Sequence, residues 1–238
     1  MAVIEGGASA ALQDVGANTK GGRVEIRPTD MGTLGSYVVV AASGTMAAGL
    51  AGAAPIFSVR WGDATRTMVV RRVGITAKNL TTAFAAGLTL FELILARAFT
   101  ASDTAGAAVA LTTNNAKRRT SFGTSLVTDM RISTTATLTA GTRTLDTVMA
   151  GAARGNVPAT QVNYPFVGKN VVVIPGASTV AYVTDYFDLF TLDTSTEWPL
   201  VLVQNEGFII RATVPATGTW TFDVVVEWSE VVSTAGYN

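Results

Sequence analysis

The chain has 238 residues, enough for one large β domain or two small ones, and 48% of them are hydrophobic, which argues against disorder over most of its length. Only 14% are charged, and 17 basic residues balance 17 acidic ones, so the sequence lacks the clustered positive charge of a protein that coats nucleic acid. The absence of cysteine excludes disulfides and zinc–thiolate sites, and the absence of histidine removes the commonest general base and transition-metal ligand.

Low charge also favours the burial of surface between copies, because little repulsion keeps monomers apart. A monomer with a neutral, threonine-rich exterior is the alternative. The segment from Met1 to Gly7 lacks the basic and apolar regions of a secretory signal, and no apolar run is long enough to span a membrane. We therefore expect neither secretory export nor a membrane partner.

The predicted elements begin with an N-terminal arm, residues 1–22, in which small residues, glycine and asparagine follow no stable period. Residues 23–238 are expected to form a single domain. In its first part, short runs of β-branched and aromatic residues with period-two alternation are closed by glycine, proline or aspartate, which indicates strands. These runs are residues 23–27, 37–42, 56–61 and 68–76.

The middle of the chain is harder to interpret. Residues 88–99 fit a strand or an amphipathic helix, and the surrounding β pattern favours the strand. Residues 126–138 alternate as a strand does, whereas residues 150–160 are small, with glycine and proline, and predict a long loop.

Two arginine-containing segments predict ion pairs. The neighbours Arg71 and Arg72 are expected to point to opposite faces of their strand, so at least one must be paired if the strand is central. Arg97 and Glu92 are expected to be cross-strand partners.

The clearest element is a predicted antiparallel hairpin, in which strands at residues 208–214 and 220–228 flank a turn at 215–218. Its second strand places five large apolar side chains on one face, which must be covered. The pattern as a whole predicts an all-β fold, an antiparallel β-sandwich that is jelly-roll-like, with an extended N-terminal arm. The five side chains are Trp220, Phe222, Val224, Val226 and Trp228.

No motif in the sequence fixes a chemistry. There is no glycine-rich phosphate loop ending in Lys-Ser or Lys-Thr and no Gly-x-Ser-x-Gly elbow, and a serine triad cannot be built without histidine. We predict that the protein is not an enzyme and has no catalytic, cofactor-binding or metal-binding residues.

Candidate ligand-binding residues lie in an acidic, aromatic segment that contains Asp185, Asp188 and Trp198, with Trp61 at the end of another strand. Such residues can bind a sugar, hold Ca²⁺ through oxygen atoms, or act as an acid/base pair. The alternative is that the acids face water at strand ends while the aromatic side chains, Trp61 included, fill the core.

Several segments resemble structural proteins of tailed bacteriophages. The resemblance is scattered over most of the chain and is strongest towards the C-terminus. It is carried by Gly16-Ala17-Asn18-Thr19-Lys20, Ala140-Gly141-Thr142-Arg143-Thr144-Leu145-Asp146, Asn205-Glu206-Gly207-Phe208, Val214-Pro215-Ala216-Thr217-Gly218-Thr219-Trp220 and Glu227-Trp228.

The resemblance implies a β-sandwich subunit of a virion, made in the host cytoplasm and assembled in multiple copies, as an accessory head-decoration or a tail or fibre protein. Its expected partners are further copies of the chain and other virion proteins, and its arm is expected to dock on a neighbour. A carbohydrate-binding module that recognises a host surface glycan is the second hypothesis, and a glycosidase that uses Asp188 is the third.

Overall fold

The computed structural model describes residues 34–50, 52–112, 114, 116–157, 159, 162, 165–168, 185–192 and 199–232, and the backbone alone of 10–14 and 20–24. Within these residues the regular structure is β-strand, and no described segment forms a helix long and apolar enough to cross a membrane. The all-β prediction is therefore confirmed.

The described strands vary from short bridging pieces to long ribbons. In chain order they are β1 (Ala10–Asp14), β2 (Lys20–Val24), β3 (Gly35–Ala42), β4 (Met46–Ala47), β5 (Ala54–Trp61), β6 (Arg66–Asn79), β7 (Gly87–Ala101), β8 (Ala107–Ala108), β9 (Val127–Ile132), β10 (Thr142–Val157), β11 (Pro165–Val167), β12 (Phe187–Thr191), β13 (Leu200–Leu202), β14 (Glu206–Thr213) and β15 (Thr219–Val232).

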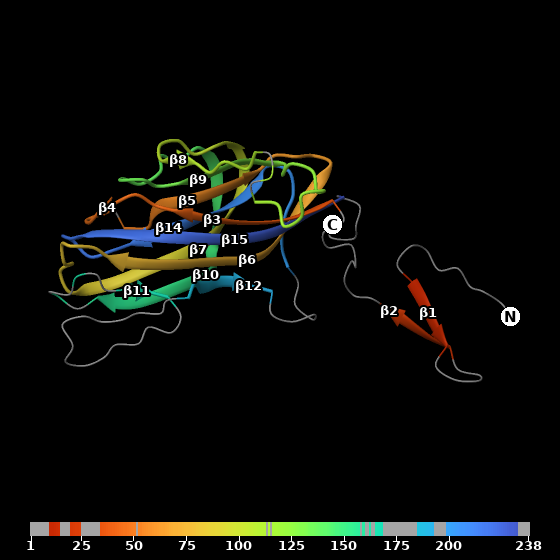
Figure 1. The fold of residues 1–238 in the computed structure, drawn as a ribbon, viewed down its shortest axis with the longest axis horizontal. Helices are drawn as coiled ribbons and strands as arrows, with labels where there is room; N and C mark the ends of the chain where they lie inside the picture. The colour runs from red at the N-terminus through yellow and green to blue at the C-terminus, as the bar shows by residue number, and fades with distance from the viewer. Residues whose placement is uncertain are drawn as a thin grey trace.

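Two antiparallel sheets build the sandwich (Figure 1). The β14 sheet has the order β10-β7-β14-β5-β9-β8, and the β15 sheet has the order β11-β6-β15-β3. The long strand β6 also pairs with β12 and β13, while β4 pairs with β15. Separately, β1 and β2 pair with each other as a two-stranded sheet that begins in the predicted arm and ends two residues beyond it.

The chain alternates between the sheets in the manner of a jelly roll. It passes from β3 to β5, β6 and β7, changing sheet at each step, then adds β10 beside β7 and the β11–β13 row beside β6. Finally β14 inserts between β7 and β5, and β15 inserts between β6 and β3. This winding of two Greek keys confirms the predicted jelly-roll-like sandwich.

The expected C-terminal hairpin is wrong in one respect. Strands β14 and β15 do not pair with each other, because the turn between them carries the chain from one sheet to the other. Thr217 and Gly218 adopt positive φ angles of 65° and 95° in this turn. The alternating apolar faces of the two strands therefore meet across the core, where each covers the other.

The predicted loop at residues 150–160 is also wrong, because β10 continues to Val157 with a regular register from Gly151 to Val157 against β7. Backbone hydrogen bonds to a long neighbouring strand hold these small residues extended, although they contribute little apolar surface. The ambiguous segment at 88–99 is a strand, as predicted.

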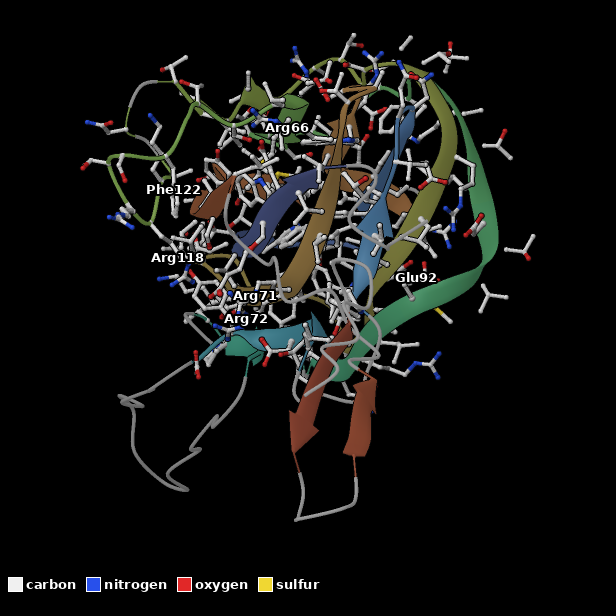
Figure 2. All side chains as sticks on the ribbon, turned by 90° about the vertical axis from the view of Figure 1, so that its right-hand side faces the viewer. Arg66, Arg71, Arg72, Glu92, Arg118 and Phe122 are labelled. Carbon is white, nitrogen blue, oxygen red and sulfur yellow. The ribbon has the colours of Figure 1, made fainter. Side chains whose placement is uncertain are left out.

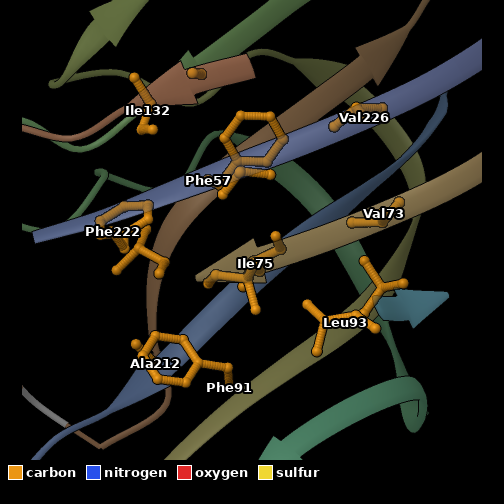
Figure 3. Close-up of a cluster of buried hydrophobic side chains, with 14 of the residues drawn as sticks. Phe57, Val73, Ile75, Phe91, Leu93, Ile132, Ala212, Phe222 and Val226 are labelled. Atoms are coloured by element: carbon orange, nitrogen blue, oxygen red, sulfur yellow. The ribbon is translucent and has the colours of Figure 1, made fainter. Parts of the chain in front are cut away.

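The core lies between the inner faces of the two sheets (Figure 3). Phe57 and Phe91 from the β14 sheet and Ile75 and Phe222 from the β15 sheet are all fully buried. Because apolar surface leaves water in both layers at once, the two sheets stabilise each other.

Aromatic pairs reinforce the two ends of the core. At one end Trp220 stacks obliquely on Phe222, with ring centroids 5.3 Å apart, and meets Phe91 edge-on at 5.9 Å. At the other end Tyr37 stacks on Trp228 at 5.2 Å. Such pairs add roughly 0.5–1.5 kcal/mol each beyond the area they bury.

A β-bulge in β6 corrects the prediction for its two arginines. The pairing with β15 shifts between Arg72 and Val70, so the extra residue Arg71 lies in the bulge. Val70 and Val73 both point into the core, and Arg71 and Arg72 are both excluded from it. The expected Arg97–Glu92 pair is wrong as well: Arg97 bonds to Glu206 and Asp146, and the partner of Glu92 is Arg211.

We expect Phe222→Ala to lower the free energy of unfolding by about 3–5 kcal/mol, because it leaves a cavity between the sheets. Urea denaturation followed by circular dichroism measures this loss. Val40→Ala is the control, since Val40 is 57% exposed and its truncation should change stability by about 0.5 kcal/mol or less. Equal effects of the two substitutions would contradict the assignment of the core.

Candidate functional site

Trp61 does not offer a face to a ligand in this structure. It is the last residue of β5, has no exposed surface and donates its indole N–H to the carbonyl oxygen of Arg66 at 3.1 Å. Of the two positions that the sequence allowed for Trp61, a ligand-binding site and the core, the structure has it in the core. Trp198, the other candidate tryptophan, lies outside the described residues.

Asp188 is the second residue of β12, which pairs with β6 in the β15 sheet, and Asp185 lies two residues before that strand. The side chain of Asp185 is 59% exposed, whereas that of Asp188 is only 10% exposed. Asp188 reaches Arg72 of β6, with 2.6 Å between Oδ1 and Nε. Asp185 lies at 4.0 Å from the same guanidinium.

The ion pairs continue across the sheet through Glu227 of β15. Arg72 lies 3.8 Å from one carboxylate oxygen of Glu227, and Arg118, from the loop before β9, lies 2.6 Å from the other. We call Arg72, Arg118, Asp185, Asp188 and Glu227 together the charged face. Figure 2 labels Arg72 and Arg118 on the same side of the molecule, with Arg71 beside Arg72.

Arg72 of the charged face keeps its positive charge. Burial opposes the charge on Arg72, but the hydrogen bond and the negative charge of Asp188 outweigh it and raise the pKa of the guanidinium. An arginine at this distance favours the ionised form of Asp188. A reaction at Asp188 would therefore have to break this ion pair first.

A glycine lets an aromatic ring lie next to the charged face. A Cβ on Gly74 would come within 3.0 Å of the Cβ of Tyr186 and within 2.8 Å of Val225. Burial, and then the negative charge of Asp223, raise the pKa of the Tyr186 hydroxyl. Burial also raises the pKa of Asp223. Tyr186 and Asp223 thus add an aromatic ring and a partly desolvated carboxyl to the same surface.

The charged face joins two arginines and three carboxylates in one connected network of ion pairs. Fixed opposite charges of this kind can set the register of a contact and reject a partner with the wrong charges. Among the residues that the structure describes, no group of three or more acidic, histidine or cysteine side chains is placed to hold a metal ion.

Sequence reasoning found the two aspartates of the charged face but missed Arg72, Arg118 and Glu227 as their companions. A signal existed for Glu227, because the alternation of β15 turns it away from the core. No local pattern brings Arg118 to the same place, since it comes from an irregular loop 109 residues away from Glu227.

Exposed apolar side chains occur on other parts of the surface. Val148 is 75% exposed and Met149 is 44% exposed, both at irregularities in the pairing of β10, which is the edge strand of the β14 sheet. Val40 is 57% exposed on β3, which ends the β15 sheet. Large apolar groups at sheet edges are candidate contacts for another chain.

Comparison of the chain with protein-family models, with curated proteins and with solved structures found no match.

We expect Arg72→Met to lower the free energy of unfolding by about 1–2 kcal/mol, because the partly buried Asp188 loses a charged hydrogen-bond donor and Glu227 loses a nearby positive charge. Arg71→Met is the matched control, since this neighbouring arginine is exposed in the bulge and should change stability by about 0.5 kcal/mol or less. Thermal denaturation of both variants tests the difference. A smaller loss for Arg72→Met than for Arg71→Met would contradict the ion-pair network.

Proposed function

We propose that the chain is a structural subunit of a bacteriophage virion, an accessory head-decoration or tail or fibre protein that is made in the host cytoplasm and acts as a homo-oligomer. The jelly-roll topology carries this proposal, because the same topology recurs in viral capsid domains. The resemblance of several segments to structural proteins of tailed bacteriophages supports the same class.

The surface supports assembly with further copies. Strand β10 spans Thr142–Val157 at the edge of its sheet, and an edge strand presents hydrogen-bonding groups to a neighbouring chain. Val148 and Met149 add apolar surface there. The net charge of zero imposes little repulsion between copies.

The hairpin of β1 and β2 supports a role for the arm. It pairs only with itself among the described strands, and an isolated two-stranded hairpin is marginally stable in water. A contact with a neighbouring subunit would supply the missing stabilisation. The β1–β2 hairpin thus supports the arm, residues 1–22, as the segment that docks on another copy.

A carbohydrate-binding module is the second candidate, because jelly rolls also occur among lectins. The exposed carboxylate of Asp185, which accepts the backbone N–H of Tyr186, favours this candidate. The burial of Trp61 and the ion pair of Asp188 weaken it, since neither side chain is free to contact a sugar. The virion subunit is therefore the better supported proposal.

We expect the full chain to form an oligomer of defined mass in light scattering, and a variant without residues 1–24 to have a lower mass. The deletion removes the whole β1–β2 hairpin and leaves every described strand of the sandwich in place. Circular dichroism and thermal denaturation of the shortened variant show whether the sandwich still folds.

A monodisperse monomer that is indifferent to the deletion would contradict self-assembly through the arm. Binding of that monomer to a host surface glycan, abolished by Asp185→Ala, would favour the carbohydrate-binding candidate instead. Asp146→Ala is the control for that measurement, because Asp146 pairs with Arg97 away from the charged face.

A further inference from the structure

Residues 116–126 form a strap that continues the β15 sheet beyond its last strand. The N–H of Val38 donates to the carbonyl oxygen of Ala116 at 2.7 Å, and the N–H of Arg118 donates to that of Ser36 at 2.9 Å. Since β3 ends the sheet, these bonds cover a backbone edge that would otherwise be open to another chain. The strap therefore shields the first half of β3.

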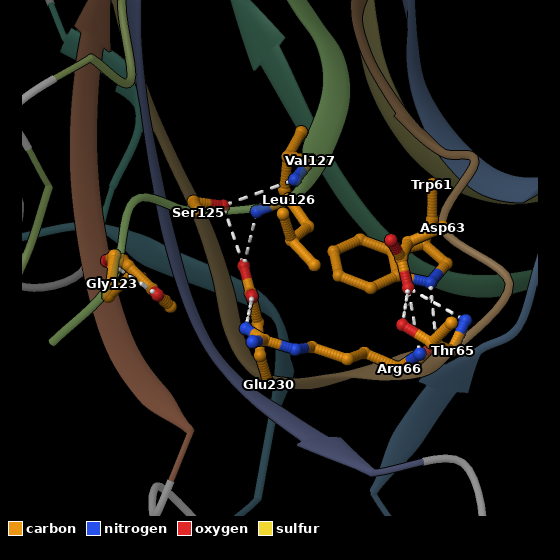
Figure 4. A network of polar contacts seen from close by, with 10 residues as sticks. Trp61, Asp63, Thr65, Arg66, Gly123, Ser125, Leu126, Val127 and Glu230 are labelled. Carbon is orange, nitrogen blue, oxygen red and sulfur yellow. Dashed lines mark hydrogen bonds and ion pairs between the residues drawn. The ribbon is translucent and has the colours of Figure 1, made fainter.

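The far end of the strap is fixed by one buried carboxylate, Glu230 of β15 (Figure 4). Its Oε1 accepts hydrogen bonds from the Ser125 hydroxyl at 2.7 Å and from the Leu126 N–H at 2.9 Å. The Glu230 side chain has no exposed surface. A movement of residues 125–126 away from β15 would remove both donors and admit water to the carboxylate.

The other groups around Glu230 come from neighbouring strands. Arg66 of β6 lies 3.4 Å from Oε2 and is 30% exposed, so it is a partly screened counter-charge. The Asp63 carboxylate accepts a hydrogen bond from the backbone N–H of Arg66 at 2.8 Å and fixes the turn before β6. Tyr37 of β3 donates its hydroxyl to the carbonyl oxygen of Gly123 in the strap at 3.0 Å.

Glu230 is the carboxyl of this cluster whose pKa lies above its usual value. Burial, and then the charge of Glu230, raise the pKa of Tyr37 to about 12, so its hydroxyl stays protonated. Burial raises the pKa of Glu230, and the hydrogen bonds from Ser125 and Leu126, the nearby indole of Trp228 and the charge of Arg66 oppose this effect only in part.

The direction of the pH effect follows from linkage. With the strap closed, the Glu230 carboxyl binds its proton more tightly than an ordinary solvated carboxyl does. With the strap open, the carboxyl is solvated and its pKa returns towards the usual value of about 4.3. Protonation therefore favours the closed strap, and a rise in pH from the usual pKa through the raised one favours opening.

We propose that the strap of residues 116–126 is a pH-sensitive cover of the β3 edge, with Glu230 as its latch. The strap is most tightly closed at acidic pH and opens more often as Glu230 ionises. Each opening uncovers the backbone of residues 36–38 at the edge of the β15 sheet. The hydrogen bonds of the strap and of Glu230 support this pH-sensitive cover, which does not depend on the proposed virion function.

Amide hydrogen exchange of the full chain, measured by NMR between pH 4 and pH 8, tests the proposal. Dividing the measured exchange rate by the intrinsic rate gives the equilibrium constant for opening at each amide. For the amides of Leu126 and Arg118, we expect this constant to increase with pH between the usual pKa of Glu230 and the raised one, by at most about tenfold per pH unit. Below and above this interval the constant should not change with pH. An opening constant that is the same throughout, or that falls with pH, would overturn the proposal.

Two variants show whether Glu230 causes the dependence. Glu230→Gln keeps an acceptor for the Leu126 N–H without a titrating group and should remove the pH dependence. Asp223→Asn is the matched control, because Asp223 is also a carboxyl of β15 with a raised pKa and should leave the dependence intact. Persistence of the dependence in Glu230→Gln, or its loss in Asp223→Asn, would contradict the latch.

A measurement on the unchanged protein covers the case in which Glu230→Gln does not fold. The carboxyl ¹³C chemical shift of Glu230 reports its own titration. We expect that titration to end, on the alkaline side, at the pH where the opening of Leu126 stops increasing. Two transitions at different pH values would overturn the proposal.

Discussion

The fold depends on the meeting of two alternating apolar faces across the sandwich. Strands β14 and β15 follow each other in the chain, yet each lies in a different sheet and covers the inner face of the other. A period of two gives each strand one apolar face, and the turn at residues 214–218 turns those faces towards each other. The outer surface of the β15 sheet is then free to carry Arg72 and Glu227, whose charges would be costly between the layers.

Much of the fold could be predicted from the sequence, but its connections could not. Alternation and the closing glycine, proline and aspartate residues correctly predict β3, β5, β6, β7 and the all-β class. Two strands show the same alternation whether they pair in a hairpin or lie in different sheets. The pairing of β14 with β15 was therefore predicted wrongly. The strand at residues 150–157 escaped prediction because backbone pairing to β7 holds it in place, and small side chains carry no sign of that pairing.

Only part of the candidate site could be predicted, because its residues come from distant parts of the sequence. Asp185 and Asp188 stand close together in the sequence, and their acidic character is a local property. Their counter-charge Arg72 is 116 residues from Asp188, and a bulge that no local pattern predicts excludes both Arg71 and Arg72 from the core. Trp61 lies at a strand end, which left both an exposed and a core position open, and a backbone carbonyl accepts its indole N–H within the core.

The placement of β14 and β15 has a consequence for the order in which the chain can fold during synthesis. These two strands follow all the other described strands in the sequence, yet each occupies the interior of its sheet. Until they leave the ribosome, β3, β5, β6 and β7 have no central partner, and their edges stay open to wrong pairings. The ordering step is therefore late and joins distant segments, which makes folding slow and places a demand on chaperones. Selection on this chain should therefore act on how long the partly synthesised chain avoids aggregation, as well as on the stability of the folded protein.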